Sequence, residues 1–114
     1  MQYCRAKSFD KFAPLGPVMV SPKSLSDPSK LRIQTKVNGQ VRQSATTAQM
    51  IFDIPRIIQY LSQGTTLRKG TVIMTGTPSG VAAFMDPPAW LKNGDVVEIE
   101  IEKIGKIENE FVFE

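Results

Sequence analysis

An apolar run that ends in glycines and a proline constrains this chain more than any other feature. Residues 72–81 read VIMTGTPSGV, so three apolar residues are followed directly by hydroxyl, glycine and proline residues. An unbroken apolar run is typical of a strand buried on both faces, and glycines let backbone approach a ligand closely. We therefore expect a buried strand over residues 72–74 and a candidate binding loop directly after it.

Three further stretches predict β-structure. Apolar and polar residues alternate over residues 31–43 around Asn38-Gly39, the dipeptide that most readily forms the type I′ turn of a hairpin. Apolar residues alternate with glutamates over residues 97–102, which predicts a strand with one dry and one solvated face. Residues 107–113 predict a final strand. The fold class that follows is mainly β with one helix (α+β).

One helix is expected after residue 53. Asp53 suits the N-cap, Pro55 falls in the first turn where its missing N–H does no harm, and Gly64 suits the C′ position. The isoleucines and the leucine between them lie on one face at helical spacing. We expect this amphipathic helix to pack on the sheet.

The remaining segments predict loops. Prolines favour an irregular, extended course for residues 1–20, and residues 21–30 indicate a surface connection with one helical turn. Residues 82–90 predict a loop closed by packing of Phe84 against Trp90.

Composition excludes several classes of protein. A chain of 114 residues suffices for one domain or a piece of one. One cysteine and no histidine exclude an internal disulfide, a Cys/His zinc site and histidine-based catalysis. The fourteen Lys and Arg are scattered, which argues against nucleic-acid binding despite the net charge of +3. No run is long enough to span a bilayer and no secretory signal opens the chain, so we expect a cytoplasmic protein, or a mitochondrial one if the source is eukaryotic.

Three glutamates raise the question of a metal site. Glu98, Glu100 and Glu102 are two residues apart on one predicted strand, so their carboxylates point the same way and can share a hard cation. A solvated strand face explains the same alternation, and we favour that interpretation.

Two other residues are candidates for binding an anion. Lys7 lies in a proline-shaped loop and can present its ammonium to a carboxylate; the alternative is an exposed lysine with no such role. Thr77, between Gly76 and Pro78, offers a hydroxyl and a backbone N–H; the alternative is a strand-end turn with a solvated threonine.

A series of short motifs, in one order across nearly the whole chain, closely resembles the fumarylacetoacetate hydrolase family. Within this family, the motifs most resemble the subgroup of fumarylacetoacetate hydrolase domain-containing proteins. That subgroup includes acylpyruvases, oxaloacetate decarboxylases, and isomerases and decarboxylases of homoprotocatechuate breakdown. The motifs are residues 7–10 (KSFD), 14–17 (PLGP), 37–43 (VNGQVRQ), 50–52 (MIF), 60–62 (YLS), 75–81 (TGTPSGV) and 91–97 (LKNGDVV).

The resemblance implies a mixed β-roll and metal-assisted chemistry on 2-oxo or 2,4-dioxo acids: hydrolysis, decarboxylation or isomerisation. It implies a divalent cation, Mg²⁺ or alternatively Mn²⁺ or Ca²⁺, that polarises the 2-oxo carbonyl. Lys7 matches the family's active-site lysine, and Thr77 matches the threonine of the Thr-Gly-Thr-Pro loop that contacts the substrate carboxylate. The resemblance also implies that Gly76 of the same loop contacts the substrate.

This chain departs from the family pattern in one respect. The family's metal ligands, a Glu-x-Glu pair and an aspartate, precede the Lys-Ser-Phe segment, whereas Glu98 and Glu100 lie near the other end of this chain. We therefore expect residues 1–114 to be the C-terminal portion of one catalytic domain, inactive alone. Uncovered strand edges also predict a homo-oligomer. The alternative is a non-catalytic, β-rich oligomerisation module.

Overall fold

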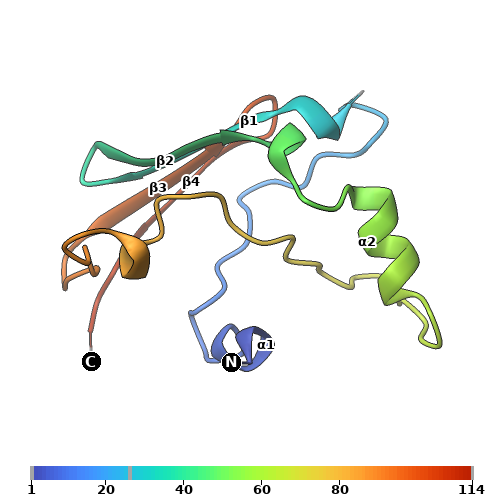
Figure 1. Ribbon diagram of the computed structural model, residues 1–114, viewed down its shortest axis with the longest axis horizontal. Coiled ribbons are helices and arrows are strands. Elements are labelled where there is room, and N and C mark those ends of the chain that lie inside the picture. The colour runs from blue at the N-terminus through green and yellow to red at the C-terminus, as the bar shows by residue number, and fades with distance from the viewer. Residues whose placement is uncertain (1, 26, 114) are drawn as a thin grey trace.

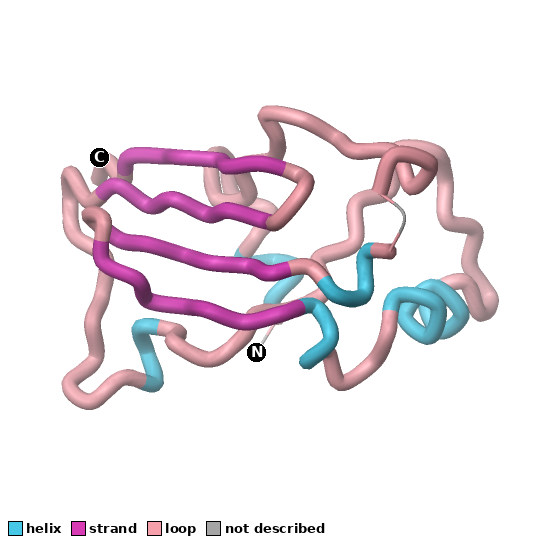
Figure 2. Tube along the Cα trace, turned by 90° about the horizontal axis from the view of Figure 1, so that it is seen from above, coloured by secondary structure: helices cyan, strands magenta, loops and turns pink. Residues whose placement is uncertain are grey.

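A four-stranded antiparallel sheet forms the centre of the computed structural model, which describes residues 2–25 and 27–113. The strands lie side by side in the order β2-β1-β3-β4 (Figure 2). Their bounds are Arg32–Val37 for β1, Gln40–Thr46 for β2, Val96–Ile101 for β3 and Gly105–Glu110 for β4. The mainly β fold with one main helix is confirmed, and the β-roll stays a prediction.

The predicted hairpin is confirmed by its turn. Asn38 and Gly39 have φ values of 50° and 77°, the two positive angles that a type I′ turn requires. The Asn38 side chain also donates to Asp95 Oδ1 (2.8 Å) and accepts from the Val96 N–H (2.9 Å), which ties this turn to the start of β3. The backbone N–H of Lys92 and the Asn38 amide both donate to the Asp95 carboxylate and lower its pKa.

The two faces of the sheet differ as the alternation predicts. On one face, β1 places Ile33 opposite Ile101 of β3, and Thr35 opposite Ile99. On the other face, the Lys106 ammonium of β4 lies 2.9 Å from Glu108 and 3.0 Å from Glu98, and both carboxylates raise its pKa. The glutamate-rich face is therefore a solvated, ion-paired surface.

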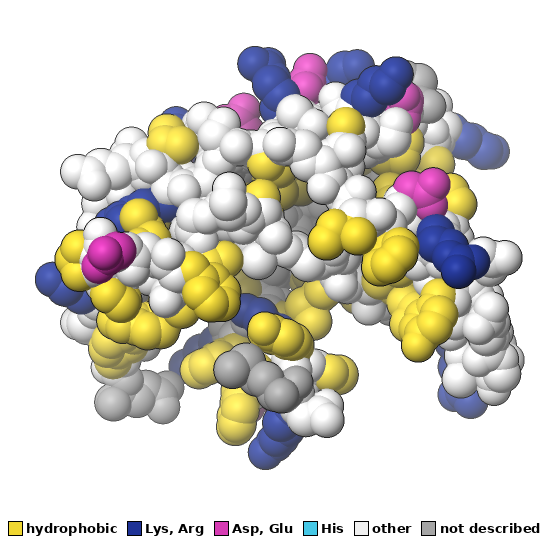
Figure 3. All heavy atoms as spheres, viewed as in Figure 1, with side chains coloured by type: hydrophobic (Ala, Val, Ile, Leu, Met, Phe, Trp, Pro, Cys, Tyr) yellow, Lys and Arg dark blue, Asp and Glu magenta, His cyan; other side chains and the backbone are white. Residues whose placement is uncertain are grey.

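Very little of the chain is fully buried. Among the described residues, Leu31 (3% exposed) and Leu25 (7%) form the buried hydrophobic core. The backbone of Leu31 is held by Thr47, whose Oγ1 accepts from the Leu31 N–H and whose N–H donates to the Leu31 carbonyl, both at 2.9 Å. Many other hydrophobic side chains lie open at the surface (Figure 3).

The main helix, α2 (Ile54–Leu61), begins as predicted but does not pack as predicted. The Asp53 side chain accepts from the Arg56 N–H at 2.8 Å, which confirms the N-cap. Gly64 has a positive φ of 71°, yet it lies two residues beyond the C-cap Ser62 rather than at C′. In the ribbon of Figure 1 and the tube of Figure 2 α2 lies beyond the end of the sheet, so the predicted helix-on-sheet packing is wrong.

Shorter elements correct two more predictions. A four-residue helix, α1 (Tyr3–Ala6), stands where irregular chain was expected, because the prolines that exclude helix come later. The 3₁₀ turns η1 (Pro28–Lys30) and η2 (Thr47–Gln49) flank the hairpin, and η3 (Ala82–Phe84) follows the glycine loop. Phe84 and Trp90 are 87% and 65% exposed, so they do not close their loop by packing.

The strand expected over residues 72–74 is absent from the described residues. This segment pairs with no strand of the sheet, and Val72 is 61% exposed. An apolar run forms a strand only where another strand accepts its hydrogen bonds, and none lies beside it in the part of the chain that the structure describes.

None of the helices described is long and apolar enough to cross a membrane.

Candidate functional site

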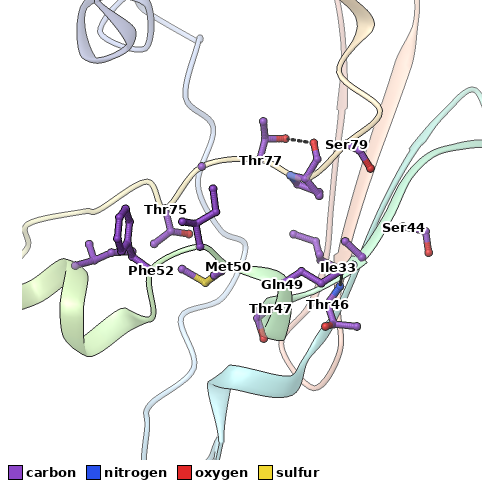
Figure 4. A pocket seen from close by; sticks show the side chains of 15 residues that line it. Ile33, Ser44, Thr46, Thr47, Gln49, Met50, Phe52, Thr75, Thr77 and Ser79 are labelled. Atoms are coloured by element: carbon purple, nitrogen blue, oxygen red, sulfur yellow. Dashed lines mark hydrogen bonds between the residues drawn. The ribbon is translucent and has the colours of Figure 1, made fainter. Parts of the chain in front are cut away.

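An open cavity of about 490 Å³ lies between the glycine loop and the end of β2. Figure 4 shows Thr75 of the loop turned toward Met50 and Phe52 from the segment before α2, whereas the Thr77 side chain lies on the opposite side of the loop. The walls come from the glycine loop, the end of the hairpin, the start of α2 and one residue of β1: residues 44–47, 49–52 and 75–79, with Ile33 and Ile57. The cavity is therefore the place where the predicted binding loop meets the sheet.

Close approach at Gly80 holds the loop against β2. Gly80 has a φ of +95°, and a Cβ added there would overlap the carbonyl oxygen of Arg42 and lie 3.1 Å from Gln43 Cγ. Only glycine combines this backbone angle with this contact. Gly76 has a φ of +101° with nothing within 4 Å of an added Cβ, so this position is not crowded by its neighbours.

A side chain of the sheet also fastens the loop. Gln43 Nε2 donates to Thr77 Oγ1 at 2.9 Å and to the carbonyl oxygen of Pro78 at 3.0 Å. The Thr77 hydroxyl makes a longer contact of 3.4 Å with the same Pro78 oxygen, drawn as a dashed line in Figure 4. Two hydrogen bonds from one amide therefore set the position of Thr77 relative to β2.

The cavity wall supplies hydrogen bonds but no charge. None of the described residues that line it is ionisable, and the polar ones carry hydroxyl or amide groups. Such groups orient a small polar ligand among apolar neighbours such as Ile33 and Phe52. A carboxylate bound here would accept hydrogen bonds from Thr77, while any positive charge has to come from outside the wall.

The structure brings two of the three predicted site residues together. Gly76 and Thr77 both line the cavity, and Thr77 is an exposed residue. Lys7 does not line it: this residue is the C-cap of α1, its side chain is exposed, and its N–H donates to the Tyr3 carbonyl at 3.0 Å. The pairing of Lys7 with Thr77 stays a prediction.

Sequence reasoning assigned no role to Gln43. The residue was part of a motif, residues 37–43, but a glutamine on a strand carries no signal of its own. Its role depends on the register of β2 and on the position of Thr77, which lies 34 residues later in the sequence. The register that places Gln43 opposite Thr35, on the face that Ile33 shares, is a property of the folded hairpin, so the sequence pattern alone does not identify this residue.

The described residues do not fit a metal ion. Within residues 2–25 and 27–113 no group of three or more His, Cys, Asp or Glu is placed to hold one. The carboxylate of Glu98 is engaged by Lys106, and Glu102 accepts from the backbone N–H of Arg32 at 3.1 Å, which lowers its pKa.

Comparison with known proteins places this geometry in a family. The family model described as "Fumarylacetoacetate (FAA) hydrolase C-terminal" matches residues 1–112. The chain is 45% identical over 109 residues to oxaloacetate tautomerase YisK of Bacillus subtilis, a match that covers 96% of this chain and 36% of YisK. The chain thus spans about a third of the length of such relatives.

Two solved structures have the same fold. The fumarylacetoacetate hydrolase of Exiguobacterium antarcticum superposes with a TM-score of 0.92 at 44% identity, covering 96% of this chain and 39% of that protein. The maleylpyruvate hydrolase of Sphingobium sp. SYK-6, solved with manganese(II) and pyruvate, has a TM-score of 0.83 at 34% identity, covering 93% and 38%. These relatives are enzymes. Over nearly its whole length, this chain belongs to the fumarylacetoacetate hydrolase family.

Proposed function

We propose that this chain is the C-terminal, carboxylate-binding part of an enzyme that hydrolyses, decarboxylates or isomerises 2-oxo or 2,4-dioxo acids. The observation that carries the proposal is the Gly76-Thr77 loop, which Gln43 fixes beside an uncharged cavity that both loop residues line. The family assignment supports the substrate class, since YisK is an oxaloacetate tautomerase and the Sphingobium enzyme is a maleylpyruvate hydrolase.

In this proposal the site has two parts that bind one carboxylate. Thr77 donates its hydroxyl and the open backbone at Gly76 adds an N–H, both of which suit an acceptor-only group. Lys7 supplies the positive charge that the cavity wall lacks. Because Lys7 does not line the cavity, the segment that carries it has to approach the loop when a ligand binds.

The proposal assigns the metal to residues outside this chain. The described residues hold no metal-ligand group, and relatives such as YisK are about three times as long as the matched part. A divalent cation, Mg²⁺ in our proposal, would be held by that additional part, and the chain alone is expected to be inactive. Oxaloacetate tautomerisation by the purified chain with Mg²⁺, at the rate of a full-length relative, would contradict this.

A cytoplasmic location belongs to the same proposal.

A chimaera tests the proposal directly. The matched 109 residues of YisK are replaced by this chain, which the 45% identity makes feasible, and oxaloacetate tautomerase activity is measured. We expect an active chimaera in which Thr77→Val lowers kcat/KM by about 10- to 100-fold, the cost of one lost hydrogen bond to a charged group. Thr71→Val, in the same exposed segment, is the control and should leave kcat/KM unchanged. A folded chimaera that is inactive, or is insensitive to Thr77→Val, would contradict the proposal.

The exposed apolar side chains favour a second candidate, a β-rich oligomerisation module. Large side chains including Phe12, Met19 and Phe84 are open to solvent, and such surface promotes association. We expect the purified chain to self-associate under either candidate. A clean monomer at high concentration in sedimentation velocity would rule out the module.

A further inference from the structure

We propose that Gln43 is a positioning residue that holds Thr77 as a hydrogen-bond donor toward the carboxylate of the bound substrate. The inference rests on the proposed function, because it concerns how the same loop recognises its ligand. It adds a residue that itself need not touch the substrate.

The register of the hairpin aims Gln43 at the glycine loop. Gln43 pairs with Thr35 and Ala45 pairs with Ile33, so Gln43 lies on the face of the sheet that Ile33 presents to the cavity. The register shifts between Thr35 and Lys36, and this leaves Arg42 of β2 without a partner in β1. The bulge therefore exposes the Arg42 backbone at the point where the loop approaches β2.

Glycine at position 80 determines how closely the loop approaches. An added Cβ there would overlap the Arg42 carbonyl oxygen, so a side chain would push the loop away from β2. At the observed separation one Gln43 amide group reaches both Thr77 and Pro78. Gly80 thus sets the separation, and Gln43 fixes the loop at that separation.

The acceptor at Pro78 determines which end of the Gln43 amide faces the loop. A backbone carbonyl oxygen only accepts hydrogen bonds, so the NH₂ of Gln43 and not its oxygen must face Pro78. The same NH₂ lies 2.9 Å from Thr77 Oγ1, and its second hydrogen therefore makes Thr77 an acceptor toward Gln43. The direction of both hydrogen bonds follows from this one contact.

Accepting from Gln43 leaves the hydrogen of the Thr77 hydroxyl for a ligand. Its present contact with Pro78 O is 3.4 Å, beyond the usual range for O–H···O bonds. A carboxylate oxygen accepts strongly and cannot donate, so it matches a hydroxyl whose hydrogen is available while one of its lone pairs is occupied by Gln43. Gln43 thus favours the orientation in which Thr77 donates to an anionic acceptor.

The test uses the ¹⁵N-labelled full chain titrated with oxalate, followed by NMR at the Gly76 and Thr77 amides. Gln43→Met keeps the side-chain length but removes both donated hydrogens, and we expect oxalate to bind about 2- to 10-fold more weakly. Gln43→Glu should weaken binding further, since it accepts the Thr77 hydrogen and adds a negative charge. Gln40→Met, an exposed glutamine of the same strand, is the matched control and should bind like the wild type.

A double-mutant cycle separates positioning from general stability. If Gln43 acts through Thr77, Gln43→Met should have no further effect on oxalate binding in a Thr77→Val background. Equal weakening in both backgrounds would overturn the inference, as would undiminished binding by Gln43→Met. If the wild type itself shows no oxalate-dependent shift at Thr77, the proposed function fails and the inference fails with it.

A measurement without ligand keeps the inference testable even if a variant folds poorly. In the wild type, hydrogen exchange of the Gln43 side-chain amide should be slowed by its two hydrogen bonds. In Thr77→Val, one of those two hydrogens should exchange faster while the other stays protected by Pro78. Fast exchange of both hydrogens in the wild type would overturn the inference independently of any ligand.

Discussion

The sheet and the segment 72–80 differ in where their apolar residues find partners. In the sheet, Ile33 of β1 faces Ile101 of β3, and Ile99 faces Ile107 of β4, so neighbouring strands cover one another. Val72 and Met74 belong to a run that is at least as apolar, yet both are exposed and unpaired within the described chain. Apolar composition alone therefore does not decide which run becomes a strand.

The two regions meet where the loop docks on β2. Gln43 bonds to Thr77 and Pro78, and Gly80 lies against Arg42. The structured sheet in this way fixes a loop whose preceding segment has no support of its own. A rigid element that positions a binding loop is the common arrangement in functional sites.

Truncation of the core should have the largest effect. Leu31→Ala removes the most buried side chain described, and we expect the free energy of unfolding to fall by about 2–5 kcal/mol. Urea denaturation followed by circular dichroism measures the loss. A loss of less than about 1 kcal/mol in the free energy of unfolding, which is typical of ordinary substitutions, would show that the sheet does not depend on this residue.

Disrupting the contact between the loop and β2 should have the next largest effect. Gly80→Ala introduces a Cβ that overlaps the Arg42 carbonyl at a strained φ, which costs about 1–3 kcal/mol while the loop stays docked. We expect the loop to leave β2 instead, with faster amide exchange over residues 75–79 and little change in the β1–β3 amides. Gly94→Ala also has a positive φ but open space around its Cβ, so it serves as the control. Unchanged loop exchange in Gly80→Ala would contradict the proposed docking.

Acid should weaken the sheet through Asp95. Its pKa in the folded chain lies below the ordinary value because the Lys92 N–H and the Asn38 amide stabilise the carboxylate. A depressed folded pKa means that the stabilisation is complete above about pH 4, the unfolded value, and is lost as the pH falls through the folded pKa. We expect the Tm of the wild type to drop more between pH 5 and pH 3 than that of Asp95→Asn. If the Tm of the two proteins fell equally between pH 5 and pH 3, Asp95 would contribute no pH-dependent stability.

A matched truncation in the unpaired segment should have the smallest effect. Val72→Ala removes an exposed side chain, and we expect the free energy of unfolding to change by less than about 0.5 kcal/mol. The same urea titration as for Leu31→Ala measures it. A loss of about 1 kcal/mol or more would show that this segment is packed in solution and would remove the difference between the two regions.

Local signals predicted the sheet well. The Asn38-Gly39 turn, the alternation before residue 102 and the Asp53 cap depend on neighbours a few residues away, and each element formed where expected. The final strand is shifted, since β4 covers Gly105–Glu110 rather than residues 107–113. Strand ends depend on the partner strand, which no local pattern specifies.

Non-local packing explains the parts that could not be predicted. Whether residues 72–74 pair, and whether α2 lies on the sheet, depends on surfaces that are far away in sequence. For the site, Gly76 and Thr77 could be found from the glycine pattern and the family resemblance. Gln43 could not, because its role exists only once the hairpin register and the loop meet.

The central claim, that the loop docked on β2 binds a 2-oxo acid carboxylate, is tested most directly by a crystal structure of the chain soaked with oxalate and Mg²⁺. We predict oxalate ordered in the cavity, with a carboxylate oxygen accepting from Thr77 Oγ1, Gln43 still bonded to Thr77, and Lys7 turned toward the ligand. A cavity without oxalate, with the side chains of Thr77 and Lys7 turned to solvent, would contradict the account.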